Sequence, residues 1–210
     1  MLRLSASVAA MTLIFALAPG GTAQPDTDRA ATGRDSLVTD PALGIAYLQI
    51  GPSARHGQHE LALSLQSPVG SIRGAVLTVC RSQKPFVDLS GSFGGRMDTD
   101  DPKITSLLEN RVRVDTVELA GLRFRREFWA VYAGMGEWEG VITCYAPHDG
   151  VYYVLSLHTG VNLGKPGEVV DGTPIGAEPL RRQLANMLFD DREPLVRRFN
   201  DFLSTIQLTN

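Results

Sequence analysis

The sequence has few of the residues that bind metals, form disulfide networks or contact nucleic acids. It contains two cysteines and four histidines among 210 residues, and its formal net charge is −3. Its lysines number three, Lys84, Lys103 and Lys165, so arginine supplies most of the positive charge. A mildly acidic chain lacks the basic surface typical of nucleic-acid-binding proteins, so we expect no nucleic-acid partner.

The sequence also lacks an apolar run long enough to cross a bilayer, which takes about 20 residues. The apolar run at residues 6–18 is shorter; Arg3 precedes it and Pro19-Gly20-Gly21 follow it. Gly21-Thr22-Ala23 place small residues where a signal peptidase cleaves. We therefore predict that residues 1–23 are a secretory signal peptide. The mature protein is then expected to be periplasmic or extracellular, with no transmembrane segment.

Residues 24–42 are small and polar and show no apolar period. Burial of such a stretch cannot offset the entropy lost on ordering, so we predict a flexible leader. The remaining residues, 43–210, have the length of one domain.

Strand signals dominate the first half of this domain. Leu61, Leu63 and Leu65 alternate with small or polar residues, which is the period of a strand with one buried face. Residues 74–79 (GAVLTV) form a continuous apolar run rich in β-branched residues, typical of a central strand covered on both faces.

Residues 111–158 predict a four-stranded antiparallel meander. Its turns are Ala120-Gly121, Gly134-Met135-Gly136 and residues 147–150 (PHDG). A two-residue turn at Ala120-Gly121 places two apolar and two oppositely charged pairs across the strands, which favours one register. Those pairs are Leu119–Leu122, Val117–Phe124, Glu118–Arg123 and Asp115–Arg126.

Helical patterns occur in three places. Asp101-Pro102 predict the start of a short helix that ends near Asn110. Two C-terminal helices are predicted from apolar stripes with arginines on the opposite side. The stripes are Leu180, Leu184, Met187 and Leu188, and then Leu195, Phe199, Phe202, Leu203 and Ile206.

These elements predict an α+β fold: a single antiparallel sheet packed by the two C-terminal helices and the short internal helix. The long meander followed by a terminal amphipathic helix, Phe199 to Leu208, resembles the shape of the Mog1/PsbP-like sandwiches. This resemblance covers the last hundred residues at the level of pattern, rests on no specific motif and implies no activity.

Cys80 and Cys144 are the two cysteines, and both lie in predicted strands. An even pair in an oxidising compartment usually bonds, so we predict a Cys80–Cys144 disulfide. The alternative is two buried free thiols that never meet. A redox role is not expected, because there is no Cys-x-x-Cys spacing to lower a thiol pKa.

The histidines suggest sites only weakly. His56 and His59 are two ligands where a zinc site needs three or four, so we predict loop histidines and no metal site. We interpret His148-Asp149 as part of a turn and not as the His–Asp pair of a catalytic triad. In a triad the aspartate orients the histidine base through a hydrogen bond, which residues adjacent in sequence cannot do. His158 lies at a strand end, where a site can form, but no neighbour in sequence selects a function for it.

Three further patterns have structural explanations. Residues 134–140 (GMGEWEG) match a degenerate form of the glycine-rich dinucleotide-binding motif. They link two predicted strands, however, and so predict a hairpin. Glu137 and Glu139 lie two apart on one strand and face the same way, unlike the paired carboxylates of a glycosidase. The five arginines at 111, 113, 123, 125 and 126 are either an anion-binding face or, as the register favours, partners of Glu118 and Asp115.

No catalytic, cofactor-binding or metal-binding set emerges from the sequence. We therefore expect a non-catalytic accessory or binding module of the cell envelope or the secreted fraction, with a protein partner in the envelope as one expectation. One alternative is an exported hydrolase that uses His158, or His56 and His59. Another is a carrier that holds an apolar ligand between the sheet and the terminal helices.

Overall fold

The computed structural model describes residues 37–89, 95–170 and 173–209, and residues 35–210 form one compact unit. The predicted signal peptide, residues 1–23, lies outside the described residues and stays a prediction. The predicted leader, residues 24–42, overlaps them at its end, where Leu37–Asp40 form strand β1. Regular structure therefore begins before the predicted boundary at residue 43.

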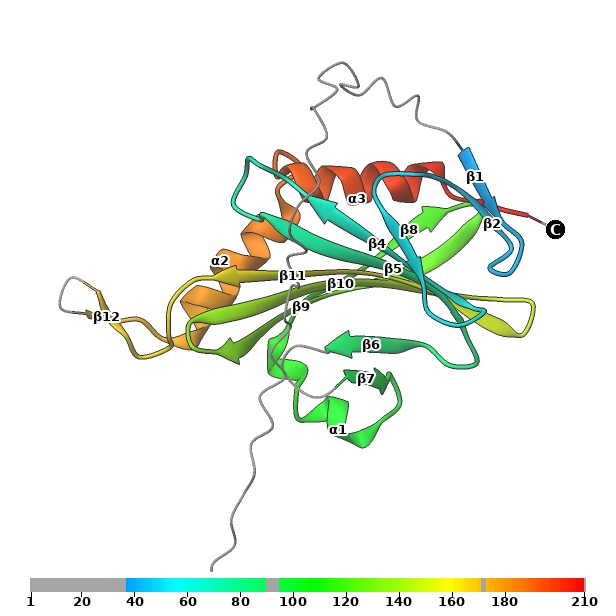
Figure 1. Cartoon of the computed structure of the whole chain (residues 1–210). Coiled ribbons are helices and arrows are strands. Elements are labelled where there is room, and N and C mark those ends of the chain that lie inside the picture. The colour runs from blue at the N-terminus through cyan, green and yellow to red at the C-terminus, as the bar shows by residue number, and fades with distance from the viewer. Residues whose placement is uncertain (1–36, 90–94, 171–172, 210) are drawn as a thin grey trace, which may run out of the picture. The chain divides into compact units, whose positions relative to one another are not determined.

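A seven-stranded antiparallel sheet forms the centre of the unit (Figure 1). The last four strands follow one another along the chain as the predicted meander, and β5 pairs with the last of them, β11. The strand order is therefore β3-β4-β5-β11-β10-β9-β8. The strands are β3 (Ser53–Arg55), β4 (Glu60–Gln66), β5 (Gly74–Ser82), β8 (Arg111–Leu119), β9 (Leu122–Gly134), β10 (Glu137–His148) and β11 (Val151–Asn162).

The turn at residues 120–121 sets the register of β8 and β9 as the sequence predicts. Both turn residues have positive φ, 50° and 77°, as a tight hairpin turn of the primed type requires. All four predicted pairs are present, from Leu119–Leu122 beside the turn to Asp115–Arg126. The register prediction is confirmed.

Two helices cover one face of the sheet, α2 (Ala177–Phe189) and α3 (Pro194–Thr205) (Figure 1). Their buried stripes agree with the sequence pattern, except that Met187 is only half-buried. The core beneath them is formed by alternate residues of the strands, as expected for a sheet with one face against helices. Its fully buried members include Leu63, Leu77, Phe124, Leu184, Leu195, Phe199 and Phe202.

The opposite face of the sheet is covered by a smaller layer, the hairpin of β6 (Phe86–Leu89) and β7 (Gly95–Asp98) with helix α1 (Pro102–Thr105) (Figure 1). Asp101 accepts a hydrogen bond from the Lys103 amide at 2.8 Å and caps α1, as predicted. The short helix then changes to the 3₁₀ turn η1 (Leu108–Asn110). A second apolar cluster forms under this layer, with Val87, Leu89, Ile104, Trp129, Val131 and Val141 buried.

Arg96 of β7 fixes this hairpin to the sheet by charge as well as by apolar contact. Its guanidinium pairs with Glu60 of β4 and with Asp88 of β6, the latter at 3.2 Å. The same group lies 4.7 Å from the ring centroid of Phe86. A planar guanidinium can pair with carboxylates at its edge while its face lies on a ring, so one arginine holds three elements.

The α+β class is confirmed, but the prediction of a single sheet was wrong. The described residues also form a three-stranded sheet of β1, β2 (Ile45–Leu48) and β14 (Gln207–Leu208), the β6–β7 hairpin, and the pair β12 (Val169–Val170) and β13 (Thr173–Pro174). These strands have two to four residues, too few to show an alternating pattern. β14 also pairs with β2 from the other end of the domain, a contact that local sequence cannot reveal.

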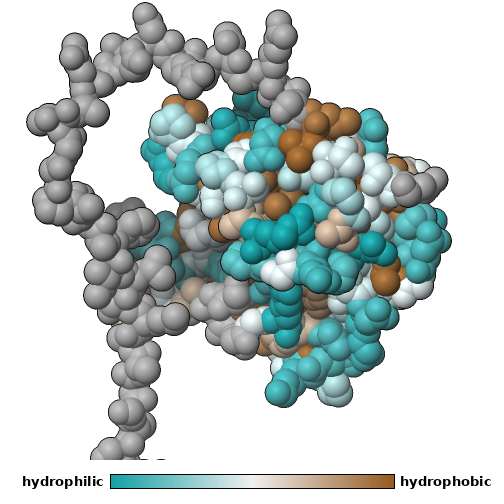
Figure 2. Space-filling view, turned by 45° about the vertical axis from the view of Figure 1, so that its right-hand side comes forward, coloured by the Kyte–Doolittle hydropathy of each residue, from teal (hydrophilic) through white to brown (hydrophobic). Residues whose placement is uncertain are grey.

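The surface of the described part is mixed in character. In Figure 2 hydrophilic and apolar residues alternate over the visible face without forming one broad apolar area. Among the described residues, no helix combines the length and apolarity needed to cross a membrane.

Candidate functional site

The two cysteines are free and buried, so the prediction of a Cys80–Cys144 disulfide was wrong. Cys144 belongs to the main core under the helices. Cys80 lies on the other side of the sheet, in a small cluster with Phe86 and Val154. The thickness of the sheet separates the sulfurs, which is why the even number of cysteines did not produce a bond.

His56 and His59 lie in exposed positions beside β3 and β4. The Nδ1 atom of His59 is 3.3 Å from the backbone oxygen of Ala42, a contact that fits a loop histidine. Within residues 37–89, 95–170 and 173–209, no three His, Cys, Asp or Glu side chains converge as a metal ion would require.

His148 and Asp149 occupy the β10–β11 turn, as predicted. Their side chains are 3.4 Å apart, but that of Asp149 is 85% exposed. Asp149 has φ +49° and is followed by Gly150 at +77°, which is again the geometry of a tight hairpin turn.

The arginine cluster is divided between the two faces of the sheet and does not form one basic surface. On the helical side, Arg113 and Arg126 share Asp115, at 2.9 and 2.7 Å. On the other side, Arg125 contacts the buried carboxylate of Glu127 at 2.7 Å. Arg111 approaches the same carboxylate at 3.6 Å. Strand alternation places the adjacent residues Arg125 and Arg126 on opposite faces, and a register shift in β8 between Arg111 and Arg113 does the same for that pair.

Residues 134–140 form the β9–β10 hairpin and the start of β10, as predicted. Trp138 points into the main core, and its indole nitrogen donates to the backbone oxygen of Gly164 at 3.0 Å. Glu137 and Glu139 point to the other face of the sheet, where they approach β11.

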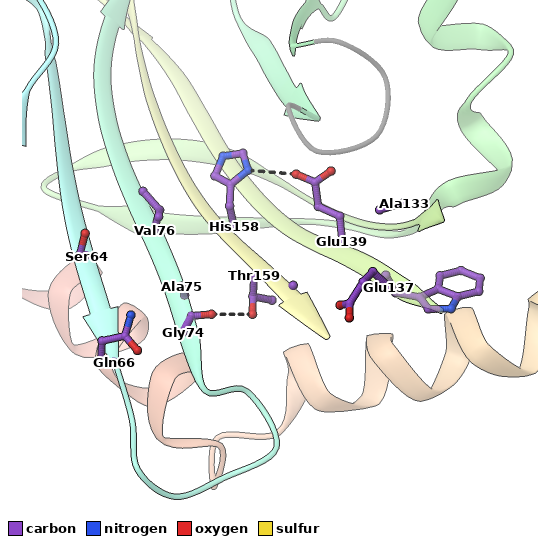
Figure 3. A pocket seen from close by; sticks show the side chains of 12 residues that line it. Ser64, Gln66, Gly74, Ala75, Val76, Ala133, Glu137, Glu139, His158 and Thr159 are labelled. Carbon is purple, nitrogen blue, oxygen red and sulfur yellow. Dashed lines mark hydrogen bonds and ion pairs between the residues drawn. The ribbon is translucent and has the colours of Figure 1, made fainter. Parts of the chain in front are cut away.

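Glu139 and His158 come together on this face of the sheet (Figure 3). The Nδ1 atom of His158 is 3.6 Å from Oε1 of Glu139. Both side chains are largely buried, 13% and 10% exposed. His158 lies opposite Val141 and Glu139 lies opposite Gly160, so the two are diagonal neighbours on one face.

A groove of about 410 Å³ surrounds this pair and crosses β4, β5, β11, β10 and the end of β9. We call it the sheet groove. Three of its lining residues, Gly74, Ala133 and Gly160, carry little or no side chain. Its lining residues are Ser64, Gln66, Gly74, Ala75, Val76, Ala133, Glu137, Trp138, Glu139, His158, Thr159 and Gly160.

Gly160 is the position that keeps the groove open. A Cβ atom built on Gly160 meets no atom of the described residues within 4 Å. The backbone there is extended strand and needs no glycine for conformational reasons. By contrast, a Cβ atom on Gly74 would lie 3.2 Å from the amide nitrogen of Gln66, which covers that part of the floor.

His158 is poorly placed for acid–base chemistry. Both ring nitrogens are buried, and within the described part of the chain neither has a hydrogen-bond partner. A general base must reach the proton that it removes, directly or through one water. Ser64 lies two strands away from His158, with Val76 of β5 between them (Figure 3). Ser64 is therefore not placed to act as a nucleophile activated by His158.

A second hollow, of about 550 Å³, lies between the β8–β9 edge and helices α2 and α3. Phe128 and Phe189 line its apolar part. Arg113, Arg126 and Asp191 also line it, so its lining is as polar as it is apolar. An apolar carrier needs a cavity dominated by apolar side chains, which makes this hollow a poor match for that alternative.

Comparison with known proteins adds no assignment. No protein-family model matches the sequence, and no curated protein is significantly similar to it.

Proposed function

We propose that this chain is an exported, non-catalytic binding module that holds a small ligand in the sheet groove. The observation that carries the proposal is an open hollow on a sheet face that is otherwise covered by the β6–β7 layer. Pockets of several hundred Å³ with an apolar lining and a few converging polar groups are the usual form of small-molecule sites. Here the apolar floor is formed by small residues, and the polar groups are Glu137, Glu139 and His158.

The export part of the proposal depends on residues 1–23, whose composition predicts a signal peptide. N-terminal sequencing of the protein from the producing cell tests it. Cleavage after Ala23 and recovery outside the cytoplasm would support export. An intact N-terminus on cytoplasmic protein would contradict it, while leaving the groove open to a separate test.

The binding part is tested by filling the groove. Gly160→Leu adds a side chain on unstrained backbone at a point where no described residue lies within 4 Å of the new Cβ atom, so we expect the variant to fold normally. The matched control is Thr116→Leu, which adds a similar side chain at an exposed position of edge strand β8. Both variants are compared with the parent protein by amide NMR during a screen of small fragments of mixed charge.

We expect fragments that shift the amides of residues 74–76, 137–139 and 158–160 in the parent and in Thr116→Leu, but not in Gly160→Leu. Two results would overturn the binding proposal. One is the absence of any fragment that acts on these amides. The other is binding that persists unchanged after Gly160→Leu.

Hydrolysis is a second candidate, favoured by the 3.6 Å approach of His158 to Glu139 inside the groove. In that scheme the carboxylate would orient the imidazole, and Nε2 would take a proton from an attacking water. Turnover of an ester, amide or glycoside by the parent, lost in His158→Gln while the fold is retained, would establish it in place of simple binding. Inactivity over a broad substrate panel would remove it.

A further inference from the structure

We infer that the sheet groove selects organic cations that donate hydrogen bonds, namely a primary amine or a guanidinium on a small apolar body. The inference rests on the proposed function and names the ligand class for the same groove. Three features of the lining support it: its charge, its apolar floor and the position of its aromatic side chain.

The first feature is the charge of the lining. Glu137 and Glu139 both line the groove, and the remaining titratable side chain among its described lining residues is His158. Of the 20 lysines and arginines in the chain, none belongs to this described lining. Elsewhere on this face Glu127 is paired with Arg125 and Glu60 with Arg96. Among its described lining residues, the groove is therefore an acidic part of the face, with two carboxylates and no arginine.

Glu137 is the carboxylate that a ligand meets first, because its side chain lies at the open end of β10 and is exposed. Its Oε1 atom accepts a hydrogen bond from the Asn162 amide at 3.0 Å. Asn162 is neutral, so this bond orients the carboxylate and leaves its charge in place. A cation held by an oriented carboxylate gains a charge-assisted hydrogen bond, about twice as strong as a neutral one.

The second feature is an apolar floor next to the charge. Val76 is 42% exposed, which is high for a valine in the middle of a strand. It lies opposite His158 on β11, and Gly160 adds no side chain to the neighbouring floor. A small apolar body on this floor would cover Val76 and bring an attached ammonium toward β10.

The third feature separates two kinds of cation. Quaternary ammonium ions are bound by the faces of aromatic rings. The ring of Trp138 belongs to the main core on the other side of the sheet and donates to Gly164. Among the described lining residues, the groove thus offers carboxylate oxygens and no exposed Phe, Tyr or Trp ring, which favours cations that carry N–H donors.

The test uses four probes that share a phenyl ring: benzylamine, benzyltrimethylammonium, benzyl alcohol and benzoate. Their dissociation constants are measured from the amide shifts of residues 74–76 and 158–160 in the parent protein. We expect benzylamine to bind about tenfold more tightly than benzyl alcohol, the difference that one charge-assisted hydrogen bond provides. Benzyltrimethylammonium should be weaker than benzylamine, and benzoate the weakest.

Glu137→Gln should raise the dissociation constant of benzylamine about tenfold and leave that of benzyl alcohol unchanged. Glu137→Lys should reverse the preference toward benzoate. The matched control is Asp149→Asn, which removes one negative charge at the opposite end of the same strand pair, from a side chain that is 85% exposed. Its affinities should equal those of the parent.

Equal binding of benzylamine and benzyl alcohol, or tighter binding of benzoate, would overturn the cation inference and leave the proposed binding function intact. The inference also fails if none of the four probes shifts these amides, and the fragment screen then decides separately whether the groove binds any ligand. Tighter binding of benzyltrimethylammonium than of benzylamine would contradict the requirement for N–H donors.

Discussion

Cys80 and Cys144 point to opposite faces of the seven-stranded sheet, and strand β11 lies between the strands that carry them. Cys80 lies opposite Val154, and Cys144 lies opposite Leu155. Consecutive residues of a strand point to opposite faces, so their partners do as well. Two strand spacings amount to about 9.5 Å, whereas bonded cysteines have Cα atoms about 4.4–6.8 Å apart. The folded sheet therefore keeps the two thiols from bonding even in an oxidising compartment.

Both thiols should react only when the protein unfolds. Burial raises the pKa of the Cys144 thiol to about 12 and also raises that of Cys80, so little thiolate exists near neutral pH. Unfolding in urea without reductant, in the presence of iodoacetamide, should add two carbamidomethyl groups by mass spectrometry, and one in Cys144→Ala. The folded protein should react slowly at both positions. Recovery of unfolded protein with no added group would show a disulfide and contradict the register.

The two arginines paired with Asp115 should make the free energy of unfolding depend on pH. The hydrogen bond from Arg126 holds the pKa of Asp115 below its ordinary 3.8. A carboxyl with a lowered folded pKa stabilises the fold above its unfolded pKa, and this stabilisation is lost as the pH falls through the folded value. Asp115→Asn should therefore reduce the free energy of unfolding by about 1–2 kcal/mol at neutral pH, and by almost nothing near pH 2. Urea unfolding at both pH values measures this, and a pH-independent difference would refute it.

Glu193 should connect the β4–β5 loop to the helices. Its carboxylate accepts the backbone N–H groups of Ser71 at 2.9 Å and Ile72 at 3.3 Å, and the residue is buried. Glu193→Ala leaves these donors unpaired, so we expect a loss of about 1–3 kcal/mol in unfolding free energy. Glu193→Gln keeps an acceptor oxygen and should lose less. An alanine variant as stable as the parent would show that water replaces the carboxylate at no cost.

Phe202 should be among the most costly residues of α3 to truncate. Its side chain is fully buried, and its ring centroid lies 5.7 Å from that of Tyr47 in β2. Phe202→Ala should lower the unfolding free energy by about 3–5 kcal/mol, because it removes apolar burial and leaves a cavity. Met135→Ala is the control: its side chain is 89% exposed, so the change should stay within about 0.5 kcal/mol. A loss at Phe202 no larger than at Met135 would mean that α3 does not depend on this contact.

Local patterns predicted the parts of the fold that local contacts determine. The β8–β9 register follows from one two-residue turn, and the C-terminal helices follow from their apolar stripes. The β6–β7 layer was not predicted, because its strands have four residues each and depend on Arg96 contacts with β4. The cysteine pairing was wrong because parity says nothing about which face of a sheet a thiol occupies.

The site could have been predicted further than it was. A two-residue turn at Asp149-Gly150 fixes the β10–β11 register in the way that Ala120-Gly121 fixes β8–β9. Counting from that turn places His158 opposite Val141 and therefore diagonal to Glu139. The groove could not be predicted in this way, because its lining comes from strands whose order in the sheet the local sequence does not reveal.

The position of β11 in the middle of the sheet has a consequence for synthesis. β5 is made early, yet its partner on the inner side is β11, which ends at Asn162. Until residues 151–162 leave the ribosome, the apolar strand Gly74–Ser82 has one unsatisfied edge, and such edges pair readily with other chains. The nascent chain thus exposes an unpaired, aggregation-prone strand edge until β11 has been synthesised. A chaperone that binds unfolded segments would act in that interval.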